Sequence, residues 1–224
     1  MDWTAFSLSV ELAAWTLLLL LPFAIWLGRI LAHRRFPGRS FVEAAVALPL
    51  VLPPTVIGFY LLVSFGSLSP LGRAWESVFG HGLAFSFEGL LMASLLINLP
   101  FAVQPIQNAF AAVPSRLREA GAVSGMSPAR VLLRIELPLA WPGIATAAVL
   151  TFAHTLGEFG VVLMVGGSIP GETRTIAIAI YDRVQAFDEA GAGIMSAVLL
   201  AVAITALGLT NTLSRRVGRR TRDA

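Results

Sequence analysis

The stretch EAGAVSGMSPARVLLRIELP, residues 119–138, interrupts a sequence that otherwise consists of long apolar runs. A short helix is expected over 115–123, and Gly125 permits the left-handed turn that ends it. Pro128 sits where a second helix begins, at the first helical position that proline favours, and this helix continues to Pro138. The pattern predicts two short helices that meet at an angle and form a compact elbow.

The composition around this stretch is that of a membrane protein. The chain has 224 residues, of which 56% are hydrophobic and 13% charged, whereas soluble domains are about one quarter charged. There is no cysteine, which excludes disulfides, thiol catalysis and cysteine metal sites. All 16 basic residues are arginines that lie beside apolar runs, so membrane topology explains them better than nucleic-acid binding.

Five apolar segments are long enough to cross the hydrocarbon core of a bilayer, which takes about 20 residues in a helix. Helices are expected because lipid offers the backbone no hydrogen-bonding partners. The expected spans are 9–31, 43–66, 87–110, 139–165 and 190–213. The sequence therefore predicts an all-α integral membrane protein, with a transmembrane domain over residues 1–214 and a short basic tail over 215–224.

The distribution of arginine predicts how the chain is oriented in the membrane. Thirteen arginines fall in the 29–42 loop, the 111–138 loop and the tail, whereas the N-terminus and the other two loops hold only Arg73, Arg174 and Arg183. Cytoplasmic loops carry the excess of positive charge. We therefore expect the N-terminus outside the cell, and the elbow and the C-terminus in the cytoplasm.

The stretch at 119–138 resembles the cytoplasmic loop of ABC importer permeases, which reads Glu-Ala-Ala, three residues, Gly, nine residues and Ile-x-Leu-Pro. The matching positions are Glu119, Ala120, Gly121, Gly125, Ile135, Leu137 and Pro138. The one departure is glycine at 121 in place of alanine, which costs up to about 1 kcal/mol of helix propensity. The resemblance implies a type I importer fold, in which the elbow sits in a cleft of an ATP-hydrolysing subunit. An amphipathic connector lying on the membrane surface is the alternative interpretation.

Four further segments resemble the permeases of molybdate ABC importers. They are HRRFPGRS (33–40), LPLVLPPTVIGFYLL (48–62), TLGEFGVVLM (155–164) and SIPGETRTIAIAIY (168–181). Sulfate permeases are looser relatives and are generally longer, so molybdate is favoured, while tungstate and sulfate stay open. The resemblance implies a homodimer in the bacterial cytoplasmic membrane, with two ABC ATPase subunits and an extracytoplasmic substrate-binding protein. It also implies that this chain binds no cofactor and that the partner subunit uses ATP-Mg.

Several residues inside the spans are polar or break helices, and these are the candidates for the pathway or its gate. Such groups need neighbouring protein or water to satisfy them in lipid. The candidates are Pro53, Pro54, Gln104, Asn108, His154 and Glu158. Static kinks and hydrogen bonds between helices explain them equally well. The Glu158 carboxylate would repel an anion, so we expect it to form a structural or gating tie with His154, Arg174 or Arg183.

A segment between the fourth and fifth spans is the candidate external gate or docking surface. It contains Gly171, Thr173, Arg174 and Thr175. Gly171 follows a proline and is expected to turn the chain, and Thr173 or Thr175 is expected to cap the helix that follows. This helix can lie on the membrane face, close the outer gate or dock a binding protein.

The sequence also separates this chain from other functional classes. A Walker A motif requires lysine, of which the chain has none, so ATP must be hydrolysed by a separate subunit. The three histidines are far apart and form no constellation of a membrane enzyme. An autonomous channel or secondary transporter explains the spans but not the elbow. Five spans enclose a pathway poorly, which predicts a pathway between two copies of the chain.

Overall fold

The computed structural model describes the backbone of residues 1–220 and the side chains through Ala206. Every regular element in these residues is helical, which confirms the all-α fold class. In chain order the helices are α1 (Trp3–His33), α2 (Arg39–Val51), α3 (Pro54–Phe65), α4 (Pro70–Phe79), α5 (Phe87–Ile97), α6 (Leu99–Ala111), α7 (Ser115–Val123), α8 (Pro128–Val131), the π-helical turn η1 (Leu132–Glu136), α9 (Leu137–Gly157), α10 (Gly160–Gly166), α11 (Ile176–Gln185) and α12 (Glu189–Arg220). The last four residues of the expected tail lie outside the described residues.

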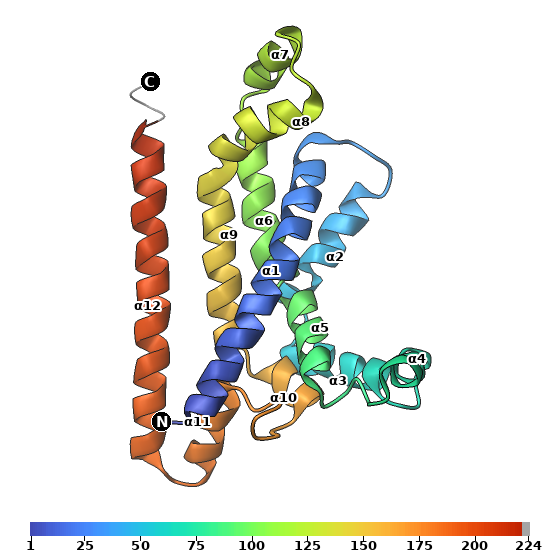
Figure 1. Cartoon of the computed structure of the whole chain (residues 1–224), viewed down its shortest axis with the longest axis vertical. Coiled ribbons are helices and arrows are strands. Elements are labelled where there is room, and N and C mark those ends of the chain that lie inside the picture. Colours follow the sequence, from blue (N-terminus) through green and yellow to red (C-terminus); the bar gives the residue numbers. More distant parts are fainter. Residues whose placement is uncertain (221–224) are drawn as a thin grey trace.

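Helices α1, α6 and α9 pack together as the core of the bundle, and α12 stands beside α9 (Figure 1). Buried side chains such as Leu27, Ile106 and Ile144 fill the space between the first three helices. The backbones approach closely at Gly143, where an added Cβ would lie 2.3 Å from the Cβ of Ala109. Small residues permit such close packing in membranes, where van der Waals contact drives helix association. The three helices therefore form a tight frame between the two ends of the molecule.

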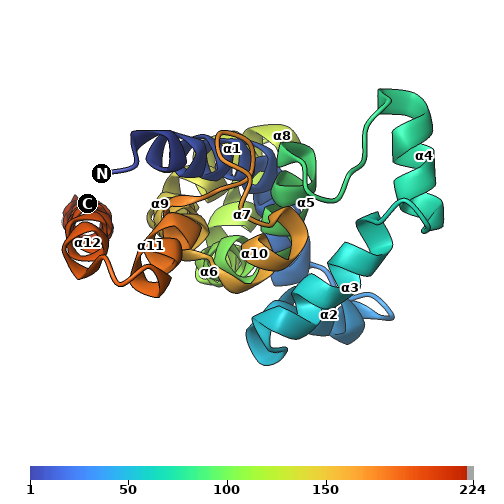
Figure 2. The same cartoon turned by 90° about the horizontal axis from the view of Figure 1, so that it is seen from below.

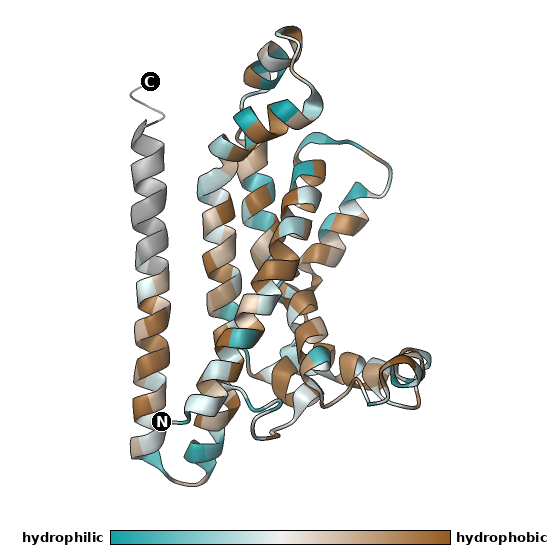
Figure 3. Cartoon of the chain, in the orientation of Figure 1, coloured by the Kyte–Doolittle hydropathy of each residue, from teal (hydrophilic) through white to brown (hydrophobic). Residues whose placement is uncertain are grey.

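The two ends of the bundle are built differently. At one end α7, α8 and η1 lie across the ends of α6 and α9, and we call residues 115–136 the elbow (Figure 1). Figure 2 views the opposite end, where α3 and α4 project away from the bundle on one side and α12 lies on the other. Apolar residues follow the helices, while hydrophilic residues gather mainly near the ends and in the loops (Figure 3). This distribution is typical of a protein that crosses a bilayer.

Four helical stretches are long and apolar enough to cross a membrane, and a bent pair of helices would make a fifth. The four are Trp3–His33, Phe87–Ala111, Pro128–Gly157 and Glu189–Ala206, and the pair is Arg39–Val51 with Pro54–Phe65. The five apolar segments expected from the sequence thus correspond to four long helices and one broken one.

The second expected span, 43–66, is divided rather than merely kinked. Helices α2 and α3 meet at 110°, with Pro53 as the residue that precedes α3 and Pro54 as its first residue. Two consecutive prolines withdraw two backbone donors, and each disfavours helical geometry in the residue before it. Helix α2 therefore ends at Val51, and α3 leaves it at a steep angle.

The fourth expected span, 139–165, also differs from expectation at both ends. Helix α9 ends at Gly157, and 160–166 form the separate helix α10. At its other end α9 continues without a break from α8 and η1, so the second short helix expected in the elbow is the first part of a helical stretch from Pro128 to Gly157. The elbow consequently has one free-standing helix, α7, and one arm that is continuous with a span.

Candidate functional site

A glycine turn separates the two arms of the elbow. Gly125 has a φ of +77° and donates its N–H to the carbonyl of Ala122 at 3.0 Å, while Met126 donates to Gly121 at 3.0 Å. These two bonds form the Schellman motif that ends a helix when the next residue is left-handed. Pro128 then opens α8 at the first helical position. The turn expected at Gly125 and the helix start expected at Pro128 are both confirmed.

Gly121 is the point where the two arms of the elbow touch. It is buried, and a Cβ added there would lie 2.9 Å from Cδ1 of Ile135 and 3.3 Å from Cγ2 of Val131. The position at which this chain departs from the alanine of related permeases therefore faces the opposite arm of the elbow. The motif residues Gly121 and Ile135, which are 14 positions apart, are in contact.

Replacing Gly121 by alanine is expected to change the free energy of unfolding by less than about 1 kcal/mol, because a gain in helix propensity is offset by a tight contact. The atom that must move, Cδ1 of Ile135, is the mobile end of a side chain. Gly121→Val, which adds two further methyl groups, should instead force the arms apart. Thermal unfolding in detergent distinguishes the two variants, and a large loss of stability with alanine alone would contradict the packing described.

The Leu-Pro at the end of the motif explains the π-helical turn. Pro138 lies in the first turn of α9, where its ring would clash with the carbonyl of the residue four positions earlier, Arg134. Over 132–136 the backbone widens into the turn η1, and Leu137 donates to the carbonyl of Leu132. A single π turn of this kind accommodates an irregularity and redirects a helix. The proline is therefore tolerated inside a continuous helix, and α8 lies at an angle to α9 (Figure 1).

A buried ion pair joins the elbow to α1, and the sequence analysis did not anticipate it. The Glu136 side chain is 1% exposed, and its Oε2 lies 2.5 Å from Nε of Arg29. Its Oε1 lies 3.7 Å from Nε2 of His33. The only sign of this ion pair in the sequence is that Glu136, an acidic residue, occupies the variable position of Ile-x-Leu-Pro. This tie means that α1 and the elbow cannot move independently without separating two charges.

The first two residues of the motif lie on the surface of the elbow. Glu119 and Ala120 are both exposed on α7. Leu137, at the other end, is half-buried where η1 passes into α9. Gly121 and Ile135 thus form a contact inside the elbow, whereas Glu119 is free to meet a partner.

At the opposite end, the two helix breaks meet each other. The Pro54 Cβ lies 2.8 Å from the position of an added Cβ on Gly160, so the first turns of α3 and α10 are in contact. Glu158 lies at the break between α9 and α10, and its Oε1 accepts the backbone N–H of Val161 at 2.9 Å. The carboxylate is therefore a helix cap for α10, a role that satisfies an otherwise orphaned donor and suits the positive end of the helix dipole.

His154 is the centre of a small polar cluster beside this break. Its Nδ1 lies 3.1 Å from Oδ1 of Asn98, and its Nε2 lies 3.8 Å from Oε2 of Glu158. Its ring stacks on Phe101 with centroids 4.0 Å apart. Asn98 is buried and donates to the Ser94 carbonyl at 2.9 Å. Of the partners considered for Glu158, the structure thus places His154 nearby.

The other two candidate pathway residues do not join this cluster. Gln104 is half-buried and Asn108 exposed, and both lie further along α6 toward the elbow. Their neighbour Gln107 instead donates to Oε1 of Glu43 at 2.9 Å, which also accepts from Arg39. Gln107 therefore ties α6 to α2, in the bonding role considered for polar residues between helices.

The candidate external segment is held in place by threonine, although not as a helix cap. Gly171 turns the chain with a φ of +80°. Thr173 is buried and donates to the Gly166 carbonyl at 2.6 Å while accepting the N–H of Ile169. Thr175 precedes α11 but makes no side-chain cap bond. The expected capping role was wrong for both threonines. Thr173 bonds within its own loop, and Thr175 does not bond to the backbone of α11.

The cap of α11 comes from α1 instead. Oγ of Ser9 accepts the backbone N–H of Ile176 at 2.8 Å, and Ile176 is fully buried. A serine 167 residues away in the chain cannot be recognised as a cap from local sequence, since capping rules look only at neighbouring positions.

Replacing Ser9 by alanine should lower the free energy of unfolding by about 1 to 2 kcal/mol, because the buried N–H of Ile176 loses its acceptor. Ser7→Ala is the matched control: Ser7 is exposed on the same helix and bonds only to the carbonyl of Thr4. Thermal unfolding in detergent should show a shift for Ser9→Ala and almost none for Ser7→Ala. Equal shifts would show that the bond between α1 and α11 is not the cause.

Two arginines, one just before α11 and one in its last turn, form ion pairs. Arg174 lies 3.1 Å from Oδ2 of Asp182 and 3.9 Å from Oδ2 of Asp2, and Arg183 pairs with Asp188. The Gly191 backbone N–H and the Arg183 guanidinium hold the pKa of the Asp188 carboxyl below its usual range. Both arginines considered as partners for Glu158 are thus engaged elsewhere.

Comparison with known proteins decides the family. A family model described as "Binding-protein-dependent transport system inner membrane component" matches residues 21–223. The chain belongs to this permease family. In such systems the ATPase is a separate subunit, and the permease crosses the inner membrane several times. The interpretation of the elbow motif as that of an importer permease is confirmed.

Among relatives of this permease, the "Molybdenum transport system permease protein ModB" of Azotobacter vinelandii is 48% identical over 85% of this chain and 84% of the relative. The protein of the same name from Escherichia coli K12 is 37% identical over 96% and 94%. The "Probable sulfate transport system permease protein cysT" of Chlorella vulgaris is 30% identical over 93% and 78%. The sequence indicated molybdate permeases as the nearer relatives and sulfate permeases as the looser ones, and both kinds are among the similar proteins.

Solved structures share the fold at low sequence identity. A chain of a bacterial ABC transporter involved in the import of alginate matches with a TM-score of 0.74 and 20% identity, over 95% of this chain and 78% of that one. A chain of the MetNI methionine ABC transporter matches with a TM-score of 0.69 and 16% identity, over 96% and 94%. The type I importer fold of this permease is therefore confirmed.

Proposed function

We propose that this permease carries molybdate across the bacterial cytoplasmic membrane, as the membrane subunit of an ATP-driven importer. The observation that carries the proposal is the 48% identity to a molybdenum permease over 85% of the chain. The packed elbow supports it, since a rigid two-armed elbow suits transmission of force from a separate motor. The transporting domain is assigned to residues 1–214, with 215–224 as a basic tail.

The charges and the fold support one arrangement in the membrane. The elbow and the C-terminus face the cytoplasm, where the arginine excess places them, and the N-terminus and α11 face outward. Two copies form a homodimer around a shared pathway, because five spans enclose a pathway poorly and α3 projects from the bundle on one side (Figure 2). Non-helical backbone at membrane depth is tolerated where it lines such a cavity or is covered by protein.

The proposed mechanism is alternating access driven through the elbow. A loaded binding protein docks outside near Gly171 and Arg174. ATP binding draws the two ATPase subunits together, and each subunit moves the α7 that it holds. Because Glu136 binds Arg29, a displacement of the elbow is passed to α1 as well as to α9. The inner gate closes, the outer gate opens near the α3–α10 contact, and hydrolysis resets the pair.

Transport assays with purified components test the function. The permease is reconstituted in liposomes with its ATPase and binding protein, and molybdate uptake is measured by mass spectrometry of the vesicle contents. We expect ATP-dependent uptake of molybdate that requires all three components. Uptake by the permease alone would identify a channel or secondary transporter, and a preference for sulfate or tungstate would reassign the cargo.

Glu119→Ala is expected to leave membrane insertion normal and to lower the uptake obtained per ATP hydrolysed, because the exposed carboxylate is placed to meet a basic or polar group on the ATPase. Arg116→Ala, on the same exposed helix, is the control. The ratio of molybdate uptake to phosphate release measures coupling. An unchanged ratio would remove Glu119 from the mechanism.

A further inference from the structure

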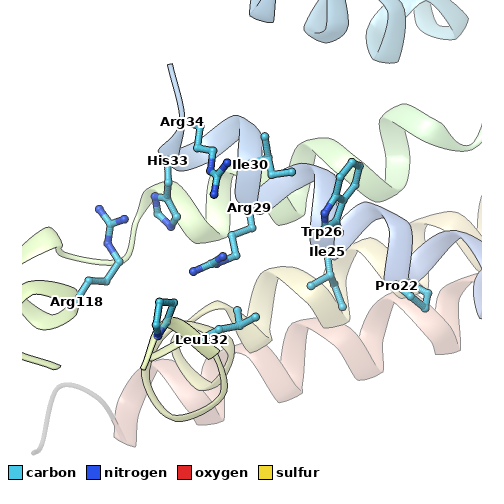
Figure 4. Close-up of a pocket in the computed structure, with 10 residues that line it drawn as sticks. Pro22, Ile25, Trp26, Arg29, Ile30, His33, Arg34, Arg118 and Leu132 are labelled. Atoms are coloured by element: carbon cyan, nitrogen blue, oxygen red, sulfur yellow. The ribbon is translucent and has the colours of Figure 1, made fainter. Parts of the chain in front are cut away.

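A basic cavity lies between the end of α1 and the elbow, outside the residues that the transport mechanism uses as gate or pathway. It has a volume of about 540 Å³. Its lining consists of Pro22, Ile25, Trp26, Arg29, Ile30, His33, Arg34, Arg118, Pro128 and Leu132. Figure 4 shows Arg29, His33 and Arg118 around one end of this space, with side chains from both α1 and α7.

The charges at this end of the cavity are not balanced. The ten lining residues include three arginines and one histidine but no carboxylate. Glu136 neutralises Arg29 and lies 3.7 Å from Nε2 of His33. Even so, Nε2 of His33 and Nε of Arg118 are buried atoms without a hydrogen-bond partner. Buried polar donors without partners are costly. The cavity therefore offers donors and positive charge to an anion that would bridge α1 and α7.

The other end of the cavity is apolar and follows one face of α1. Pro22, Ile25, Trp26 and Arg29 recur at helical spacing along this face, and Trp26 is 59% exposed. Tryptophan favours the boundary between lipid tails and headgroups. A ligand that fits the whole cavity has an anionic group at the elbow and a hydrocarbon part that runs back along α1. An inorganic anion would occupy only the basic end.

We propose that this cavity binds an acidic phospholipid of the cytoplasmic leaflet. The phosphodiester lies between Arg118 of α7 and the side chains of His33, the last residue of α1, and Arg34, which follows it. An acyl chain lies against Ile25 and Trp26. The proposal rests on the cytoplasmic placement of the elbow proposed above. Basic pockets beside membrane helices on the cytoplasmic side bind such headgroups. The lipid would hold α7 against α1 and so set the resting position of the elbow.

Native mass spectrometry of the purified full chain tests the site without requiring transport. The protein is titrated with phosphatidylglycerol or phosphatidylcholine of the same acyl composition, and bound lipid is counted. We expect preferential retention of phosphatidylglycerol. Arg34→Gln combined with Arg118→Gln should weaken this retention by about 20-fold or more, since each basic residue near an acidic lipid contributes a factor of about five. Both arginines are unpaired in the described residues, so the variant should fold.

The matched control is Arg35→Gln combined with Arg116→Gln. Arg116 lies on α7 with Arg118, and Arg35 follows Arg34 in the loop after α1. Both carry the same charge as the first pair and lie outside the cavity. The control variant should bind phosphatidylglycerol like the unaltered chain. Equal weakening in the two variants, or no preference for phosphatidylglycerol, would overturn the proposal. Displacement of the lipid by millimolar inorganic phosphate would instead assign the basic end to a soluble anion.

Discussion

Replacing Gly125 by proline is expected to abolish molybdate uptake while leaving the permease inserted in the membrane. Proline holds φ near −65°, whereas Gly125 requires +77°. The substitution also removes the N–H that bonds to Ala122. Together these changes disfavour the native turn by about 3 kcal/mol or more. The angle between α7 and α8 would then change, and movement of the ATPase subunit would no longer be passed to the spans.

A second glycine provides a close control for this substitution. Gly80 ends α4 with a φ of +76° and donates its N–H to the carbonyl of Glu76 at 2.9 Å. As at Gly125, an added Cβ would meet nothing within 4 Å. Gly80→Pro therefore carries the same local penalty at the opposite end of the molecule. Uptake assays should show loss for Gly125→Pro and retention for Gly80→Pro, at equal amounts in the membrane. Normal uptake by the Gly125 variant would show that the elbow does not transmit the motion.

Replacing Glu136 by glutamine should lower the free energy of unfolding by about 3 kcal/mol, because it leaves the partly buried guanidinium of Arg29 without its counter-charge. This loss lies at the lower end of the range that is usual when one partner of a buried ion pair is removed, since the Arg29 side chain is 33% exposed and reaches some solvent. Thermal unfolding in detergent measures the loss. The double variant Glu136→Leu with Arg29→Leu should recover most of it, because it removes both charges together.

The partly exposed pair of Arg39 and Glu43, in which neither side chain is buried, is the comparison for this ion pair. Its two charged atoms lie 3.0 Å apart, but both side chains are about one third exposed. Arg39→Gln should therefore cost no more than about 0.5 kcal/mol. If the two single variants lost the same stability, burial would not be the source of the strength of the Glu136–Arg29 pair.

The features that the sequence predicted well are those encoded locally. The positive φ at Gly125 and the helix start at Pro128 follow from the conformations that glycine and proline allow, and both are present. The apolar segments follow from length and hydropathy alone. The motif spacing identified the elbow because Gly121 and Ile135 must meet across the turn, and the structure brings them into contact.

The features that the sequence missed depend on partners far away in the chain. Ser9 caps a helix that begins 167 residues later, and Glu136 pairs with an arginine 107 residues earlier. No local rule contains these pairings, because packing of the whole bundle creates them. The end of the fourth span was also misplaced, since the apolar sequence continues past Glu158 although α9 ends at Gly157. At the second span the break at Pro53 and Pro54 was expected, but the 110° angle between the two helices was not.

The contact between α3 and α10 has a consequence for how the cell makes this protein. Both helices begin at a break, and neither is long enough to cross a bilayer: α3 has 12 residues and α10 has 7. In the homodimer proposed above, a second protomer would shield the exposed break before α3, which a newly synthesised single protomer would hold against lipid. An unmatched copy should thus be a preferred substrate for membrane quality-control proteases, and its lifetime should lengthen as the concentration of protomers rises.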